Sequence, residues 1–277
     1  MVEDEEGDED DMVLDKGDIM WLGLDEDKER NLLSLSNEGG KKRRTWKDDV
    51  NKMNEVLNKE GIGSAILEIY SPPRVDAIAR MWSLLPGWSL DLTCVDEEDG
   101  KPWDFCKQEK RDKAERMVKD KSAMLLIGSP MCSAFSQLQS LNRTRMGEQR
   151  FWENVNKALV HLRFCAKLYR MQMENGLYFL HEHPAGAKSW EEDAIGNLLR
   201  DERVFNVEGD MCQFGMTQDV QGSLSYVRKR TRFMTNAEAI AGRLARRCAG
   251  KHDHVHLVGG RAKKAEIYPE DLCKEII

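Results

Sequence analysis

The spacing of apolar and polar positions along this chain predicts strands and helices in alternation. Four short runs have the continuous apolar or alternating pattern of strands: residues 65–70, 88–94, 123–127 and 177–181. Three longer segments have helical spacing: residues 75–85, 107–120 and 151–173. Such alternation favours an α/β fold with a mainly parallel sheet and helices on both faces.

The first part of the chain is polar, and the folded part is expected to begin near residue 64. Residues 1–40 are expected to be an acidic disordered tail, because the first eleven residues hold eight Asp or Glu and no Lys or Arg. Residues 41–63 are expected to form a polar helical arm, and residues 64–277 the folded domain. Without those eleven residues the formal charge of −7 becomes −7 + 8 = +1. A nearly neutral body permits a nucleic-acid partner but does not predict one.

The composition indicates a globular protein without a membrane partner. Hydrophobic residues make up 40% of the chain and charged residues 33%, and no apolar run approaches the roughly 20 residues that span a bilayer. The acidic start is unlike a signal or transit peptide, so the nucleus or the cytoplasm is expected. The seven cysteines are odd in number and irregularly spaced, which favours free thiols.

The loop at residues 128–136, GSPMCSAFS, follows directly on the strand at 123–127. Loops at the carboxyl ends of parallel strands carry the chemistry of such sheets. The stretch resembles GGPPCQGFS, the nucleophile loop of cytosine-5 methyltransferases, in which the cysteine attacks the pyrimidine ring. The matching positions are Gly128, Pro130, Cys132, Ala134 (small, in place of glycine), Phe135 and Ser136, and the departures are Ser129, Met131 and Ser133. A nucleophilic Cys132 is thereby implied; the alternative is a buried cysteine in an ordinary turn.

Two later segments hold further residues to which the resemblance gives catalytic roles. Glu182 follows the last predicted strand, where the family has a glutamate that contacts ring nitrogen 3 of cytosine; a helix cap is the alternative. Residues 227–236, VRKRTRFMTN, resemble a late strand whose arginine pair orders the nucleophile loop. Arg228 and Arg230, or Arg230 and Arg232, have the spacing that places both guanidinium groups on one strand face. A solvated basic edge is the alternative.

S-adenosylmethionine is the cofactor that the resemblance implies. The family's first strand has an acidic and an aromatic position followed by FxGxGG, whose glycines let the backbone approach the cofactor. Glu68 and Tyr70 keep the first two features, but Pro72 and Pro73 replace the glycines, fix φ and remove amide donors. The other expected cofactor contacts are Asp91 or Asp96 for the ribose, Trp103, Asp104 and Phe105 for the adenine, and Pro130.

The resemblance covers residues 64–277 and implies a Rossmann-like methyltransferase fold that acts on nucleic acid, DNA more than RNA. Only residues 237–262 separate the arginine strand from the closing helix, so a large target-recognition domain is not expected. The phrases LEIYSPPRV, GSPMCSAFS, YFLHEHP and HLVGGRAK look most like divergent methyltransferase-like segments of copia-type retroelement polyproteins of protists. The alternative function is a catalytically inactive Rossmann relic that serves as a nucleic-acid-binding or assembly module of a retroelement.

Two histidine groups suggest other chemistry. His181 and His183 would be the candidate bases if Cys132 were the nucleophile of a hydrolase. Residues 248–256, CAGKHDHVH, could supply zinc ligands, and Cys212 would complete such a site only through a tertiary contact. Because no CxxC pair accompanies them, no metal is expected, and His254 and His256 are predicted to alternate along a strand.

Overall fold

The computed structural model describes residues 45–277 except 122, 221 and 258–260, so the predicted acidic tail at 1–40 lies outside the described residues. Its centre is a six-stranded sheet with the strand order β2-β1-β3-β4-β8-β5. The strands are β1 (Ser64–Ile69), β2 (Trp88–Leu90), β3 (Ala123–Gly128), β4 (Tyr178–Pro184), β5 (Phe205–Asp210) and β8 (Arg230–Thr235). All four strands predicted from the apolar pattern are present, with β2 shorter than expected.

One strand of the sheet is reversed. Strands β2, β1, β3 and β4 are parallel, whereas β8 pairs antiparallel with both β4 and β5. The register sets Thr231 of β8 opposite Pro184 of β4, so β8 begins where β4 ends. The prediction of an α/β fold with a mainly parallel sheet is confirmed, and the reversal brings residues before β8 to the carboxyl edge of the parallel strands.

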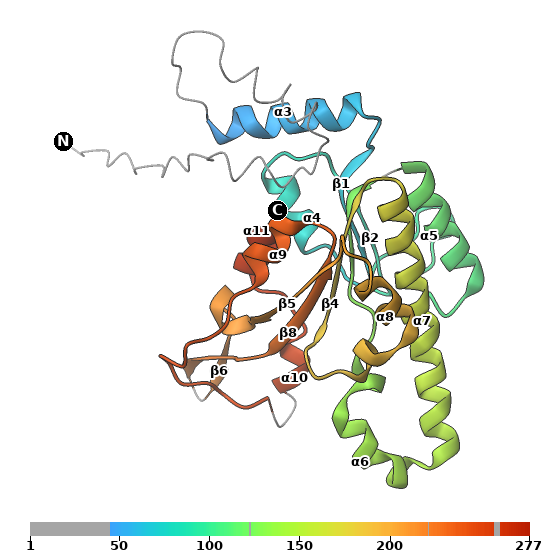
Figure 1. Cartoon of the computed structure of the whole chain (residues 1–277), viewed down its shortest axis with the longest axis vertical. Coiled ribbons are helices and arrows are strands. Elements are labelled where there is room, and N and C mark those ends of the chain that lie inside the picture. The colour runs from blue at the N-terminus through green and yellow to red at the C-terminus, as the bar shows by residue number, and fades with distance from the viewer. Residues whose placement is uncertain (1–44, 122, 221, 258–260) are drawn as a thin grey trace, which may run out of the picture.

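Helices cover both faces of the sheet, as predicted (Figure 1). One face packs against α3 (Trp46–Lys59), α4 (Val75–Met81), α9 (Glu238–Leu244) and α11 (Glu270–Ile276). The other packs against α5 (Gln108–Lys121), α7 (Glu148–Glu174) and α8 (Asp193–Leu199). Neighbouring residues of a strand point to opposite faces, so Ile66 and Leu67 of β1 enter different cores. This two-sided burial explains the continuous apolar runs of β1 and β3.

The predicted helical arm is α3, and it packs against the domain. Thr45 and Asp48 form a capping box at its start, which satisfies backbone amides that a helix leaves unpaired. Leu57 is buried in the core on the α4 side, and the Asn54 side chain donates to the Ser83 carbonyl and accepts from the Leu85 amide. The helix is therefore part of the folded body.

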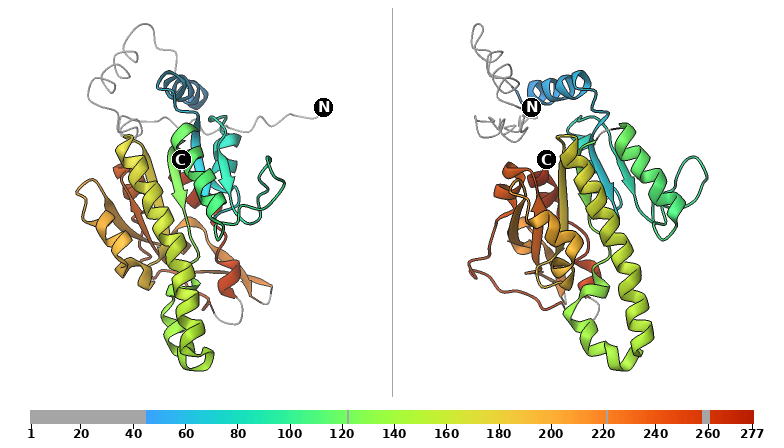
Figure 2. Two further views of the ribbon diagram at one scale, coloured as in Figure 1. Left: turned by 90° about the vertical axis from the view of Figure 1, so that its right-hand side faces the viewer. Right: turned by 45° about the vertical axis from the view of Figure 1, so that its right-hand side comes forward.

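The helix predicted at 151–173 is present as α7, but several other elements were not predicted. Helix α6 (Gln137–Met146) is one of them, and with the first half of α7 it forms a hairpin that extends beyond the sheet (Figure 2). A separate hairpin consists of β6 (Thr217–Val220) and β7 (Ser223–Tyr226). The strand predicted at His254 and His256 is wrong, because His254 makes only an isolated bridge with Tyr226. Among the described residues, no helix is both long and apolar enough to cross a membrane.

Candidate functional site

The loop that carries Cys132 and the residues that follow β4 lie at one edge of the sheet. Strands β3 and β4 are parallel neighbours, with Gly128 opposite His181. Glu182 comes one residue later, and a short 3-10 turn, Ser133–Phe135, begins directly after Cys132. The structure thus brings together the two residues, Cys132 and Glu182, that the sequence placed at consecutive strand ends.

Glu182 is 6% exposed, and its carboxylate is held at both of its oxygens. Lys229 approaches Oε1 with its Nζ at 3.3 Å, and the hydroxyl of Tyr268 donates to Oε2 at 3.3 Å. The same Tyr268 hydroxyl shares a 2.5 Å hydrogen bond with Ser129 Oγ in the cysteine loop. Charge-assisted bonds of this kind fix the direction in which a carboxylate points. Glu182 is therefore positioned by residues from β8's leading end and from the C-terminal segment.

The Cys132 thiol is half-buried, and its surroundings raise its pKa overall. Burial raises the pKa of Cys132, the negative charge of Glu182 raises it further, and Lys229 lowers it. The thiolate is the nucleophilic form of cysteine, so the resting site holds a weak nucleophile. Any change that removes the negative charge of Glu182 favours the thiolate.

His183 is hydrogen-bonded to the cysteine loop. Its Nε2 lies 2.7 Å from the Pro130 carbonyl, which can only accept, and its Nδ1 lies 2.6 Å from Ser189 Oγ. A neutral ring that donates from Nε2 and accepts at Nδ1 satisfies both contacts, and burial lowers the pKa of His183, which favours that form. Both nitrogens are thus engaged in holding the loop. His181 is likewise bonded, through Nδ1, to the Tyr169 hydroxyl at 3.0 Å. This arrangement does not favour either histidine as a hydrolase base.

The three candidate arginines are directed toward other partners. Arg230 pairs with Glu208 at 2.6 Å, and Arg228 lies 3.6 Å from Asp210, both acids being on β5. Arg232 donates to Asn206 and lies over the ring of Trp190 at 4.5 Å. The cation that reaches Glu182 is Lys229, which stands between two of these arginines in VRKRTRFMTN. Sequence reasoning missed Lys229, although the basic segment was the correct signal, and nothing in the pattern pointed to Tyr268.

Glu68 on β1, the predicted cofactor acid, accepts hydrogen bonds from residues of its own loop. Glu68 is fully buried, and its Oε1 accepts hydrogen bonds from the backbone amides of Arg74 and Asp76 at 2.8 and 2.9 Å. Its Oε2 accepts from Ser71 Oγ at 3.1 Å. Burial raises the pKa of Glu68 against the effect of these bonds. The carboxylate therefore shapes the turn between β1 and α4.

Tyr70 is hydrogen-bonded to His161, which lines a cavity next to the cysteine loop. Tyr70 has a φ of 60°, a backbone conformation that is uncommon outside glycine, and its hydroxyl is 3.0 Å from His161 Nδ1. His161 also lines a cavity of about 290 Å³, close to the size of small-molecule sites. Loop residues Met131, Ser133 and Ala134 form another wall of this cavity, together with Cys106 and residues of α6 and α7.

The remaining predicted cofactor residues do not line that cavity, or they are hydrogen-bonded within local turns. Asp91 accepts from the amide and hydroxyl of Thr93, and Asp104 accepts from the Cys106 amide. Trp103 is 4% exposed and belongs to the core, where Lys110 Nζ lies 4.9 Å from its ring. Pro130 supplies its carbonyl to His183.

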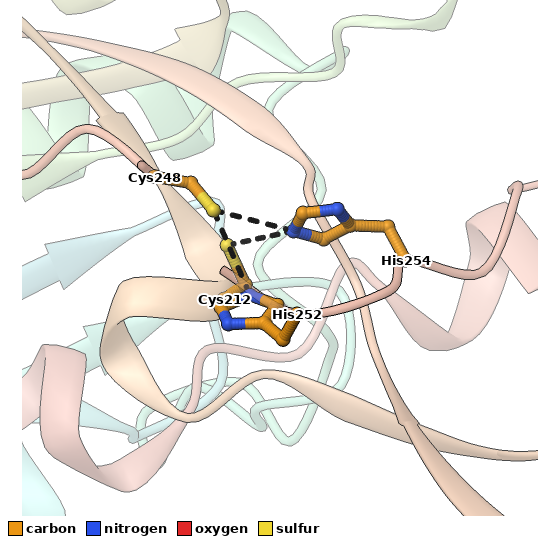
Figure 3. A group of neighbouring side chains, drawn as sticks. All are labelled: Cys212, Cys248, His252 and His254. Carbon is orange, nitrogen blue, oxygen red and sulfur yellow. Dashed lines mark hydrogen bonds between the residues drawn. The ribbon is translucent and has the colours of Figure 1, made fainter. Parts of the chain in front are cut away.

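A second group of side chains lies away from Cys132 and could hold a metal. Ligand atoms of four residues lie within 4.8 Å of one another (Figure 3): Cys212, Cys248, His252 and His254. The sequence pattern had included His256 and favoured a polar loop without metal. The structure brings Cys212 to the group through the tertiary contact that the sequence analysis required, from the 3-10 helix η4 (Met211–Phe214) after β5, and leaves His256 outside the group.

Comparisons of this chain with family models, with curated proteins and with solved structures found no match. The geometry of the site itself therefore carries the functional interpretation. Its distinguishing feature is a cysteine and a fixed carboxylate at adjacent strand ends.

Proposed function

We propose that this chain is a cytosine-5 methyltransferase-like protein with a Rossmann-like fold that acts on nucleic acid through Cys132. The observation that carries the proposal is the placement of Cys132 and the buried Glu182 at the ends of the adjacent parallel strands β3 and β4, with the Glu182 carboxylate held by Lys229 and Tyr268. The mainly parallel sheet, with the site at the carboxyl ends of β3 and β4, supports it. DNA is the preferred partner.

The chemistry begins with a pyrimidine base flipped out of its stack into the site. The Cys132 thiolate adds to carbon 6 of the ring, and a proton shared between Glu182 and ring nitrogen 3 neutralises the charge that develops there. Carbon 5 becomes electron-rich in this adduct. In the absence of a methyl donor, carbon 5 takes up a proton from water. Loss of the original carbon-5 proton to water, return of the nitrogen-3 proton to Glu182 and expulsion of the thiolate then restore the base.

The resting charges of the site fit this order of events. Glu182 keeps the pKa of Cys132 raised while the site is free of a base. A cytosine that shares a proton with Glu182 removes part of that negative charge, and Lys229 then remains to favour the thiolate. Base binding and thiol activation are thereby coupled through one carboxylate.

S-adenosylmethionine would supply the methyl group, and the residues of the β1 loop do not fit it as they stand. The Glu68 oxygens are already occupied by three donors of their own turn, and Pro72 offers no amide. The cavity of about 290 Å³ beside the cysteine loop is the alternative place for a ligand.

The β1 loop, whose Glu68 carboxylate is already hydrogen-bonded within the loop, favours a second candidate function. A relic that retained the base-binding half and lost the cofactor half would act as a nucleic-acid-binding or assembly module of a retroelement. The hydrogen bonds that Glu68 makes to Arg74, Asp76 and Ser71 favour it.

Hydrogen exchange at carbon 5 of cytosine tests the Cys132 step without any methyl donor. The protein is incubated in heavy water with single-stranded and duplex oligonucleotides, DNA and RNA, and incorporation of deuterium is read by mass spectrometry. We expect exchange with the native chain, none with Cys132→Ser, and native exchange with Cys273→Ser, a buried thiol on α11. Exchange that survives in Cys132→Ser, or no exchange by the native chain on any substrate, would overturn the proposal.

Calorimetric titration with S-adenosylmethionine then separates the two candidates. Binding, followed by covalent trapping of Cys132 on a fluorinated-cytosine oligonucleotide, supports methyl transfer. No binding at millimolar ligand supports the relic.

A further inference from the structure

Two cysteines and two histidines from separate segments converge at the end of the sheet that carries β5. Cys212 lies in η4, directly after β5, while Cys248, His252 and His254 lie in the segment that follows α9. Their side chains point toward a common centre (Figure 3). Cys212 is buried and the other three are half-buried, so the group is enclosed and still reachable from solvent.

Three sulfur-to-nitrogen distances within the group match those of a tetrahedral metal site. His254 Nε2 lies 3.4 Å from Cys212 Sγ and 3.5 Å from Cys248 Sγ, and His252 Nε2 lies 3.6 Å from Cys248 Sγ. Zinc binds sulfur at about 2.3 Å and nitrogen at about 2.0–2.1 Å, so tetrahedral angles put a sulfur and a nitrogen ligand about 3.6 Å apart. All three contacts are close to that edge length.

Hydrogen bonding alone accounts less well for these contacts. The single Nε2 of His254 is close to two sulfurs, and the single sulfur of Cys248 is close to two Nε2 atoms. An imidazole nitrogen has one proton or one lone pair, so it can form one good hydrogen bond at a time. A cation at the centre satisfies all four atoms at once.

The surroundings of the group are organised as in a ligand site. The Gly250 amide donates to Cys248 Sγ at 3.3 Å, a contact that stabilises a thiolate. The Cys248 amide donates to the buried Asp210, which fixes this segment beside β5. On the other side, the Val255 amide donates to the Tyr226 carbonyl at the end of β7. Cys248, and the segment that carries His254, are therefore placed by hydrogen bonds outside the group itself.

We propose that Cys212, Cys248, His252 and His254 bind one Zn²⁺ in a structural site. Two sulfur and two nitrogen ligands in a tetrahedral arrangement select zinc, and four protein ligands leave no open position for catalysis. The ion ties the turn after β5 to the segment after α9. That turn is joined to the candidate active site, because the Met211 amide donates to the Lys229 carbonyl at 3.0 Å. The zinc site does not depend on the proposed function.

Metal analysis of the 277-residue chain, purified under reducing conditions and dialysed against buffer that contains trace zinc, tests the site. We expect about one zinc per chain in the native protein and less than about a tenth in Cys248→Ser and in His254→Ala. Cys106→Ser and His256→Ala are the matched controls, because both residues are exposed and lie outside the group. These controls are expected to keep their zinc. A native protein without zinc, or control variants that lose as much metal as the ligand variants, would overturn the site.

Cobalt substitution keeps the test decisive if the ligand variants fail to fold. Co²⁺ in a site with two thiolates gives sulfur-to-cobalt charge-transfer absorption and the strong visible bands of tetrahedral coordination. The native chain and both controls are expected to show these bands, which added Zn²⁺ bleaches. Weak octahedral bands alone in the native chain would contradict the proposal.

Discussion

Gly128 opens the cysteine loop, and the structure explains why a glycine stands there. A Cβ at this position would lie 2.0 Å from the Tyr169 hydroxyl and 2.9 Å from its ring carbon Cζ. Tyr169 cannot easily withdraw, since it is fully buried and stacks on Phe179 at 4.7 Å. Its hydroxyl also donates to the Gly128 carbonyl and bonds to His181. Gly128→Ala therefore forces a shift in a closely packed part of the core.

The expected cost follows from two effects. Overpacking of a core position costs about 1–3 kcal/mol, and disturbance of the buried Tyr169 hydrogen bonds adds about 1 kcal/mol. We expect Gly128→Ala to lower the free energy of unfolding by about 2–4 kcal/mol and the Tm by roughly 5–15 °C. Urea denaturation followed by circular dichroism measures the first, and calorimetry the second. Gly242→Ala is the matched control, because a Cβ at that site on α9 meets no atom within 4 Å; its stability should stay unchanged or rise.

A double-mutant cycle identifies the clash itself. Tyr169→Phe removes the atom that lies 2.0 Å from the new Cβ, so the combined variant should lose less stability than the sum of the two single variants, by about 1 kcal/mol or more. Additive losses, or a Gly128→Ala protein as stable as the native chain, would refute this account of the loop.

The charges around Cys132 and the buried ion pairs near β2 give further predictions. Glu182→Gln should lower the pKa of Cys132 and speed its alkylation by iodoacetamide at pH 7.5, whereas Lys229→Met should raise that pKa and slow the alkylation. Peptide mass spectrometry against pH measures both alkylation rates. Equal rates in the two variants would contradict the electrostatic coupling. Burial raises the pKa of Asp96, but hydrogen bonds from Lys110 and Lys113 lower it to about 2 overall. This carboxylate therefore stabilises the fold above its unfolded pKa of about 3.9, and its contribution of about 2 kcal/mol or less is lost as the pH falls through 2. Asp96→Asn should show a smaller fall in stability between pH 4 and 2 in urea titrations, and an unchanged acid limb would contradict this.

The local pattern was sufficient to predict the main elements of the fold. Runs such as 123–127 are apolar on both faces because helices cover both sides of the sheet, and that burial imposes a signal over consecutive residues. The hairpin β6–β7 was not predicted, because its strands are short and largely exposed. Their sequence therefore lacks the alternation of apolar and polar residues that burial of one face imposes.

The order of elements also predicted that Cys132 and Glu182 would be neighbours. Parallel strands end at the same edge, so two strand-end residues meet there if the strands are adjacent. The reversal of β8 decided which cation lies beside Glu182. With this strand reversed, Lys229 contacts Glu182, while Arg228 and Arg230 contact the acids of β5. Tertiary packing of Tyr268 from the end of the chain had no counterpart in any local pattern.

By itself the sequence determined the α/β alternation, the loop with Cys132 and the strand end with Glu182, because each depends on residues that are close together in the chain. Only the tertiary structure decided what those residues touch. In the folded chain the Glu68 carboxylate is hydrogen-bonded within its own turn, and Glu182 is held by Lys229. Cys212 lies beside Cys248 although β6, β7, β8 and α9 lie between them in the sequence. The physical reason is the same in each case: hydrogen bonds and ligand geometry act over a few ångströms in space, whatever the separation along the chain.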